Sequence, residues 1–138
     1  MIQVLLAEDN AADVYLIREA LREHAVNCEL RVAADGQEVL EVLTGASANV
    51  SELKLIILDL NLPRHDGIEI LERLRNSGLR NIPIVVLTSS DSQRDRDLAM
   101  KLGAVRFLRK PSELEQFLSL GAVFKELLGE SNAAAESA

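Results

Sequence analysis

The chain has 138 residues and a mass of 15.1 kDa, which is the size of one ordinary globular domain. Its apolar fraction of 48% and its mean hydropathy of +0.08 argue against a disordered or linker-rich chain. With 22 acidic and 15 basic residues the net charge is -7, so we expect no direct binding to nucleic acid, whose phosphates would be repelled.

Cysteine content and the length of the apolar runs bear on cellular location. The single cysteine, Cys28, cannot form an internal disulfide, and the amino terminus lacks the pattern of a signal peptide. The longest apolar runs, at residues 55–58 and 84–87, are far shorter than the ~20 residues that a bilayer span needs. We therefore expect a cytoplasmic protein without a membrane segment.

Five short runs along the chain have the character of β-strands. Those at residues 2–7, 55–58 and 84–87 are almost unbroken apolar segments rich in β-branched residues, which predicts central strands covered on both faces. Those at residues 29–33 and 105–109 partly alternate apolar with charged residues, which predicts edge strands.

A helical stretch follows each predicted strand. Each begins with a capping side chain three residues before a carboxylate or an amide, a spacing that favours a first helical turn. The pairs are Asn10 with Asp13, Asp35 with Glu38, Asp66 with Glu69, Ser90 with Gln93, and Ser112 with Glu115. Behind four of these caps, apolar residues recur at three and four positions, and Gly103 is typical of a helix end.

Strands that alternate with helices in this way predict an α/β fold. Right-handed crossovers between parallel strands leave helices on both faces of the sheet. With the second and fifth strands at the edges, the strand order is 2-1-3-4-5, the flavodoxin-like doubly wound arrangement. We assign this domain to residues 1–128, and we expect residues 129–138, which lack branched and aromatic apolar residues, to be a disordered tail.

In a sheet of this kind the ligand site lies beyond the carboxyl ends of the strands, at the switch between the first and third strands. Glu8 and Asp9 follow the first predicted strand and Asp59 follows the third, while Thr88 ends the fourth and Lys110 follows the fifth. Each of these residues alone is compatible with ordinary turn, cap or strand-end chemistry. Their common position at one rim predicts a functional site.

Three carboxylates at one rim also predict a metal ion. Two like charges ~5 Å apart repel by roughly 3 kcal/mol at an effective dielectric constant of ~20. A hard divalent cation with oxygen ligands, Mg²⁺ above all, would relieve that repulsion. Zn²⁺ is disfavoured because His24 and His65 lie on separate segments and Cys28 has no neighbouring thiol.

Four motifs, in order along the chain, resemble the response-regulator receiver domain of bacterial two-component signalling. The resemblance covers residues 2–128 and rests on Leu5-Leu6-Ala7-Glu8-Asp9-Asn10, residues 58–67, Val86-Leu87-Thr88-Ser89, and Gly103-Ala104 followed by residues 107–111. One departure is His65, where that family usually has a bulky apolar residue. The resemblance implies that Asp59 accepts a phosphoryl group.

The resemblance also implies the ligands of the metal ion. Asp9 and Asp59 would bind Mg²⁺ directly, Glu8 through water, and the backbone carbonyl of Asn61 would add one more oxygen.

Three further residues would link phosphorylation to a response. Lys110 would supply positive charge, and the hydroxyl of Thr88 would bond the new phosphoryl oxygen and draw Thr88 inward. Phe107 would then turn into the vacated space and change a surface formed by the fourth helix, fifth strand and fifth helix, where a second copy or a target could bind. Plain edge-strand packing remains the alternative role for Phe107.

The position of the carboxyl end predicts a stand-alone response regulator, because the chain stops soon after the fifth predicted helix. Such a protein would act through other proteins and would not be an enzyme. Residues 8–14 and 59–67 resemble stand-alone receivers that serve phytochrome-type and hybrid sensor histidine kinases, which makes such a kinase the expected partner.

Three other functions share parts of this pattern. A haloacid-dehalogenase-like phosphatase also uses Mg²⁺, a lysine and a strand-end aspartate, but it needs a second acid where Asn61 stands. A nucleotide- or flavin-binding domain needs a phosphate loop after the first strand, where two acids would repel phosphate. A pseudo-receiver that binds proteins without being phosphorylated is distinguished by experiment.

Overall fold

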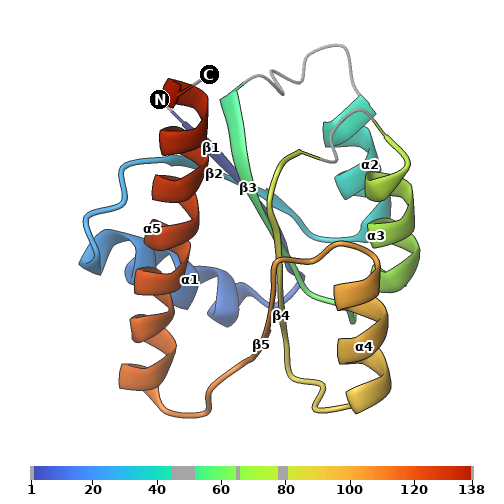
Figure 1. Cartoon of the computed structure of the whole chain (residues 1–138). Coiled ribbons are helices and arrows are strands. Elements are labelled where there is room, and N and C mark those ends of the chain that lie inside the picture. The colour runs from blue at the N-terminus through green and yellow to red at the C-terminus, as the bar shows by residue number, and fades with distance from the viewer. Residues whose placement is uncertain (1, 45–51, 65, 78–80, 138) are drawn as a thin grey trace.

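The computed structural model describes residues 2–44, 52–64, 66–77 and 81–137 of the chain. His65, singled out in the sequence analysis, lies outside these residues, as do Met1 and Ala138 at the two ends of the chain. In chain order the elements are β1 (Gln3–Ala7), α1 (Ala11–Glu23), β2 (Glu29–Ala33), α2 (Gly36–Thr44), β3 (Leu53–Leu58), α3 (Gly67–Arg75), β4 (Ile84–Thr88), α4 (Gln93–Lys101), β5 (Arg106–Arg109) and α5 (Leu114–Ser137) (Figure 1).

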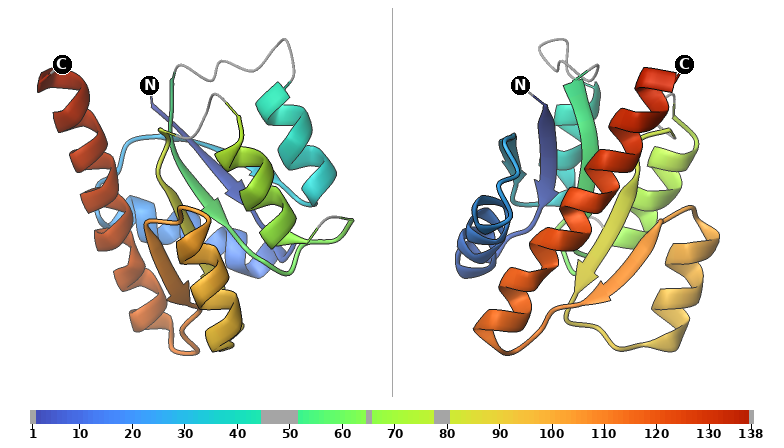
Figure 2. Two further views of the ribbon diagram at one scale, coloured as in Figure 1. Left: turned by 45° about the vertical axis from the view of Figure 1, so that its right-hand side comes forward. Right: turned by 60° about the vertical axis from the view of Figure 1, so that its left-hand side comes forward.

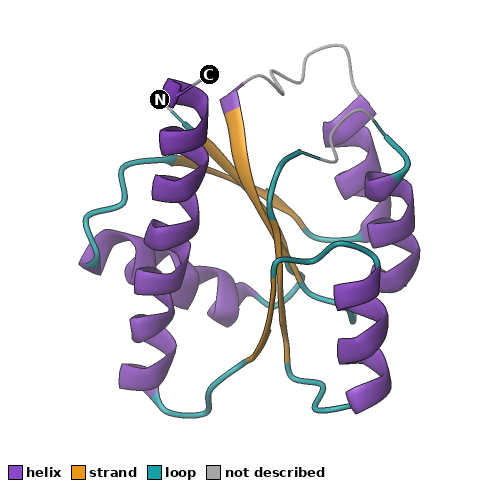
Figure 3. Cartoon of the chain, viewed as in Figure 1, coloured by secondary structure: helices purple, strands orange, loops and turns teal. Residues whose placement is uncertain are grey.

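The five strands form one parallel sheet in the order β2-β1-β3-β4-β5, which confirms the predicted topology. Helices α1 and α5 cover one face of the sheet, and α2, α3 and α4 cover the other (Figures 1 and 3). The alternation of helix and strand along the chain produces this three-layer arrangement because each parallel crossover needs a helix.

Burial along the strands follows the predicted difference between centre and edge. Every residue of β1 and β4 is buried, whereas β2 and β5 carry exposed and half-buried positions. Alternate residues of β1 enter two separate cores, Leu5 on the side of α2, α3 and α4, and Leu6 on the side of α1 and α5. Each fully buried leucine contributes roughly 1.5 to 3 kcal/mol to stability.

Two helix boundaries differ from the sequence prediction. The cap of α4 is Ser92, whose side chain accepts the backbone N–H of Asp95, and not Ser90. Two serines compete for this role, and the hydroxyl of Ser90 is instead engaged with the Asp95 carboxylate at 2.9 Å. At the other end of the chain α5 continues to Ser137, where a disordered tail from residue 129 was expected. Alanine, frequent in this segment, has the highest helix propensity, and extending an existing helix avoids the cost of nucleation.

Among the described residues, none of the helices combines the length and the apolar character that a membrane span requires.

Helix α5 packs closely against α1, and a glycine makes the contact possible. A Cβ atom added at Gly121 would lie 2.2 Å from the backbone oxygen of Ala20 and 2.4 Å from the ring of His24. The two helices lie on the same side of the sheet in both views of Figure 2 and are in contact with each other. Because backbone atoms cannot move aside as a flexible side chain can, this close approach of α1 and α5 requires glycine at position 121.

We predict that Gly121→Ala destabilises the protein by about 1 to 3 kcal/mol, because the added methyl group overpacks the contact between α1 and α5. The matched control is Gly129→Ala in the same helix, where an added Cβ would meet nothing within 4 Å. Because alanine has a greater helix propensity than glycine, Gly129→Ala should leave stability unchanged or raise it by up to about 1 kcal/mol. Urea denaturation of both variants measures the difference, and equal effects at the two positions would contradict the prediction.

Candidate functional site at the carboxyl ends of the strands

The sheet brings the predicted site residues together at one rim by backbone hydrogen bonds. Glu8 is the first residue after β1, and its N–H donates to the carbonyl of Ala33 at 3.0 Å. Asp59, the first residue after β3, donates its N–H to the carbonyl of Ala7 at 3.0 Å. The N–H of Lys110 donates to the carbonyl of Thr88 at 2.8 Å. The strand pairing therefore extends one residue beyond each strand and fixes the backbone of the site.

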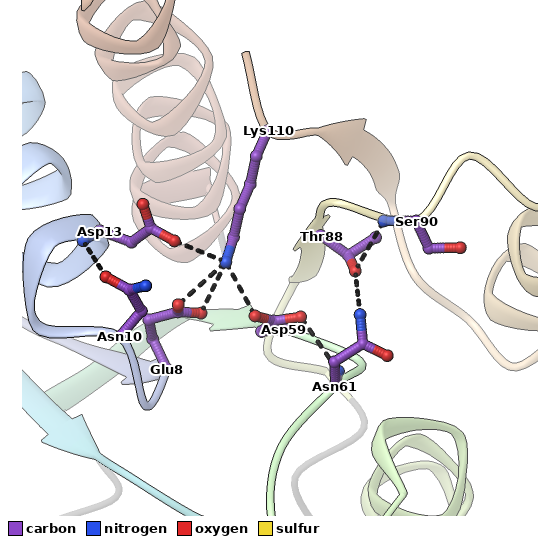
Figure 4. Close-up of polar contacts among 8 residues, drawn as sticks. All are labelled: Glu8, Asn10, Asp13, Asp59, Asn61, Thr88, Ser90 and Lys110. Atoms are coloured by element: carbon purple, nitrogen blue, oxygen red, sulfur yellow. Dashed lines mark hydrogen bonds and ion pairs between the residues drawn. The ribbon is translucent and has the colours of Figure 1, made fainter. Parts of the chain in front are cut away.

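The ammonium of Lys110 lies at the centre of the site, among three carboxylates (Figure 4). Its Nζ donates to Asp59 Oδ2 at 2.9 Å, to both Glu8 oxygens at 2.9 and 3.1 Å, and to Asp13 Oδ2 at 2.8 Å. The side chains of Glu8 and Asp59 are only 2% and 6% exposed. An ammonium has three N–H donors, so the three carboxylates use its whole capacity.

A second set of hydrogen bonds joins Asp59 to Thr88. The backbone N–H of Asn61 donates to Asp59 Oδ1 at 3.0 Å, and the Asn61 side-chain amide donates to the Thr88 hydroxyl oxygen at 3.3 Å. The backbone N–H of Ser90 donates to the same oxygen, also at 3.3 Å. The two Asp59 oxygens therefore have separate partners, with Lys110 on one and Asn61 on the other.

Burial and hydrogen bonding give the two inner carboxyl groups opposite pKa shifts. Burial, with a hydrogen bond to Asp59, raises the pKa of Glu8 to about 8. Burial alone would also raise the pKa of Asp59, but hydrogen bonds from Glu8 and Lys110 outweigh it and lower that pKa. Burial likewise opposes the charge of Lys110, yet its bonds to Asp13, Asp59 and Glu8 raise the pKa of its ammonium. The shifts of Asp59 and Lys110 thus favour their charged forms, whereas the shift of Glu8 favours its neutral form.

The carboxylates form a cluster that fits a divalent cation. One oxygen from each of Glu8, Asp9 and Asp59 lies within 4.8 Å of the others, and Asp9 is exposed to solvent. Oxygen donors of this kind suit a hard divalent cation better than a soft one. The additional ligand expected from the carbonyl of Asn61 stays a prediction.

Phe107, the expected switch residue, packs at the edge of the core. It lies on β5, is 9% exposed, and belongs to the cluster on the side of α2, α3 and α4. The guanidinium of Arg96 from α4 lies 5.9 Å from the centre of its ring, within the range of a cation–π contact. This packing agrees with a structural role and leaves the switch role a prediction.

Asp13 is the site residue that sequence reasoning missed. Its spacing from Asn10 predicts a helix cap, and the Asn10 side chain does accept the Asp13 N–H at 3.1 Å. The Asp13 carboxylate also reaches Lys110, a contact across 97 residues of sequence. The sequence did contain a signal for this contact: Asp13 lies in the first turn of the helix that follows Glu8 and Asp9. A helix that begins at the rim places its first turn near the rim.

Comparison with known proteins identifies the family. The family model described as response regulator receiver domain matches residues 4–120. The chain belongs to this family. It is 35% identical to the response regulator Rcp1 of Synechocystis sp. over 120 residues, which cover 85% of this chain and 82% of that protein. It also spans 48% of the length of the response regulator MprA of Mycolicibacterium vanbaalenii, at 32% identity and over 86% of this chain.

Two solved structures extend the comparison to the fold. The phosphorylated cyanobacterial phytochrome response regulator RcpA has a TM-score of 0.83 and 35% identity, with 92% of this chain and 93% of that chain covered. The Mn²⁺-bound form of response regulator Rcp1 has a TM-score of 0.80 and 30% identity, with 91% and 92% covered. The receiver fold, the two-component family and the likeness to phytochrome response regulators inferred from the sequence are thus confirmed.

We predict that the metal-free protein loses stability as the pH rises from about 5 to about 8.5. The folded-state pKa of Glu8, about 8, lies above its ordinary value of 4.5, so its contribution is complete below about pH 4.5 and is lost toward pH 8. The midpoint of thermal unfolding in EDTA should fall over this range, by roughly 3 to 5 °C for each kcal/mol of stability that is lost.

Glu8→Gln provides the control for this pH dependence, because the amide cannot ionise. The other shifted groups act outside the window: Asp59 is affected below its ordinary value of 3.8, Cys28 above 9.0 and Lys110 above 10.5. A fall of equal size in Glu8→Gln would show that another group causes it.

Proposed function

We propose that this receiver domain accepts a phosphoryl group on Asp59 from the phosphohistidine of a sensor histidine kinase. The observation that carries the proposal is the position of Asp59, whose carboxylate accepts a hydrogen bond from the Lys110 ammonium at 2.9 Å and has an oxygen within 4.8 Å of oxygens of Glu8 and Asp9. A phosphoryl group on that carboxylate would meet positive charge from Lys110. The likeness to the phosphorylated response regulator RcpA supports the same proposal.

The chemistry follows from the charge state of Asp59. An ionised carboxylate oxygen attacks phosphorus, the bond from phosphorus to the donor nitrogen breaks, and the donor leaves with the electron pair. The low pKa of Asp59 keeps this oxygen free of a proton, and the bond from the Asn61 N–H orients the carboxylate. Lys110 stabilises the charge that develops on the transferred oxygens.

Glu8, Asp9 and Asp59, with the carbonyl of Asn61, would hold Mg²⁺ at the same place. Mg²⁺ supplies positive charge to the phosphoryl oxygens when it is bound. The acidic cluster and the likeness to a Mn²⁺-bound response regulator support a divalent cation here. Mg²⁺ is the proposed ion because it is bound by one or two carboxylates together with phosphate oxygens.

The downstream part of the proposal is a change in protein binding. The Thr88 hydroxyl, which now accepts hydrogen bonds from Asn61 and Ser90, would rotate to the phosphoryl oxygen, and Phe107 would follow. The surface of α4, β5 and α5 would then bind a partner or a second copy. Similarity to Rcp1 and RcpA supports a phytochrome-type kinase as the donor, and the lone Cys28 fits the cytoplasm.

We predict one added phosphoryl group on the protein after incubation with acetyl phosphate and Mg²⁺. Intact-mass spectrometry should detect it, and hydroxylamine should remove it because an acyl phosphate is a mixed anhydride. The adduct should be absent in Asp59→Asn and suppressed by EDTA. An adduct at full yield in Asp59→Asn would contradict the assignment of Asp59, and no adduct on the wild type would favour a pseudo-receiver.

We predict that an activating ligand shifts self-association or kinase binding by roughly 5- to 150-fold in dissociation constant, the usual range of allosteric coupling. Sedimentation velocity with and without beryllofluoride and Mg²⁺ measures the shift. Thr88→Ala should bind the activator yet lose most of the coupling, and Arg106→Glu on β5 should weaken the complex itself. Identical association with and without activator would contradict the switch but not the phosphorylation of Asp59.

A further inference from the structure

The carboxylate of Asp13 differs from the other two partners of Lys110 in where it lies. Glu8 and Asp59 both contribute oxygens to the acidic cluster that fits a divalent cation. Asp13 is not a member of that cluster, although its Oδ2 lies 2.8 Å from Lys110 Nζ. Figure 4 shows Asp13 and Asp59 on opposite sides of the ammonium. Among the described residues, Asp13 is therefore the one carboxylate that contacts Lys110 outside the candidate metal site.

This difference matters once the site is in use. A cation in the cluster would attract the oxygens of Glu8 and Asp59, and phosphorylation would turn the Asp59 carboxylate into an acyl phosphate, a mixed anhydride without the carboxylate charge. The cation would weaken the hydrogen bonds of both groups to Lys110, and phosphorylation would weaken that of Asp59. Neither event acts directly on the hydrogen bond from Lys110 to Asp13.

We propose that Asp13 is a positioning residue, which holds the Lys110 ammonium in place so that a free N–H faces the phosphoryl group on Asp59. The inference rests on the proposed function. A lysine side chain has four flexible methylene groups, so an unanchored ammonium samples many positions. A charge-assisted hydrogen bond to a fixed carboxylate restricts that motion before the reaction begins.

The fold makes Asp13 a suitable anchor. Its backbone N–H is held by the Asn10 side chain at 3.1 Å, in the first turn of α1. Helix α1 itself packs closely against α5, where Gly121 meets the backbone of Ala20. The Asp13 side chain is 22% exposed, so the anchor lies at the edge of the site and leaves its centre open.

Positioning and simple electrostatics predict opposite results for the loss of Asp13. If its negative charge only repelled an anionic phosphodonor, its removal would speed phosphorylation. If it holds Lys110, its removal slows phosphorylation in spite of the lower negative charge. The direction of the effect therefore decides between the two.

The experiment compares Asp13→Ala and Asp13→Asn with the wild type and with Glu19→Ala. Glu19→Ala is the matched control because it removes a carboxylate and its ion pair with Arg22 from the same helix, away from Lys110. Acetyl phosphate is the donor: an Asp59 oxygen bonds to phosphorus, the bond from phosphorus to the acetyl oxygen breaks, and acetate leaves with the electron pair. Intact mass follows the rate over a range of donor concentrations, and calorimetry measures the affinities for Mg²⁺ alone and for beryllofluoride with Mg²⁺.

Asp13→Ala should lower the rate at saturating donor and the beryllofluoride affinity by about 10-fold, the scale of a lost supporting contact at a metal or phosphate site. Its Mg²⁺ affinity should stay within about two-fold, a split that general damage to the fold would not produce. Asp13→Asn keeps an oxygen that accepts from Lys110 and should recover most of the loss. Glu19→Ala should match the wild type.

Three results would overturn the inference. A rate in Asp13→Ala equal to or above the wild type would reject positioning while leaving the phosphorylation of Asp59 intact. If the phosphorylation rate falls as much in Asp13→Asn as in Asp13→Ala, the hydrogen-bond acceptor at position 13 does not position Lys110. Failure of the wild type itself to form an adduct on Asp59 would reject the proposed function and this inference together.

Discussion

The Lys110 ammonium is surrounded by carboxylates that arrive from three separate parts of the chain: Glu8 after β1, Asp59 after β3 and Asp13 in α1. Taking ions of this kind out of water costs several kcal/mol for each, and the cost is offset only when partners with good geometry surround them. Lys110 supplies that partner for both buried carboxyl groups, with its Nζ 2.9 Å from an oxygen of Asp59 and from an oxygen of Glu8. The rest of the site depends on this balance between the cost of burying charged groups and the ion pairs that they make with Lys110.

The balance also explains why a buried carboxylate can serve as a nucleophile here. Asp59 is only 5% exposed, and burial by itself would favour the neutral acid. The hydrogen bonds from Lys110, Glu8 and the Asn61 backbone reverse this preference. Burial excludes water from the carboxylate, and hydrogen bonding keeps it charged, so the two effects together give an ionised oxygen in a poorly hydrated place.

Much of this could be predicted from the sequence, because the relevant signals are local. Unbroken apolar runs distinguish β1, β3 and β4 from the edge strands, and the strand order follows. The carboxyl ends of parallel strands meet at one edge, so Glu8, Asp59 and Lys110 could be assigned to one rim without knowledge of any distance. What the sequence did not reveal depends on orientation in space. The contact of Asp13 with Lys110 requires the direction of α1, and the choice of Ser92 over Ser90 as a cap depends on the path of a loop. The length of α5 was missed because composition was given more weight than helix propagation.

The hydrogen bond between the backbones of Lys110 and Thr88 has a consequence for how such a domain can vary. The two residues proposed to contact the same phosphoryl group are held at a fixed spacing by main-chain atoms, which every amino acid except proline provides. Substitutions at the exposed positions of β5 can change the outer surface without moving these two anchors. The receiver scaffold thus separates the part that must stay constant, which is fixed by strand register, from the part that can diverge to recognise different partners.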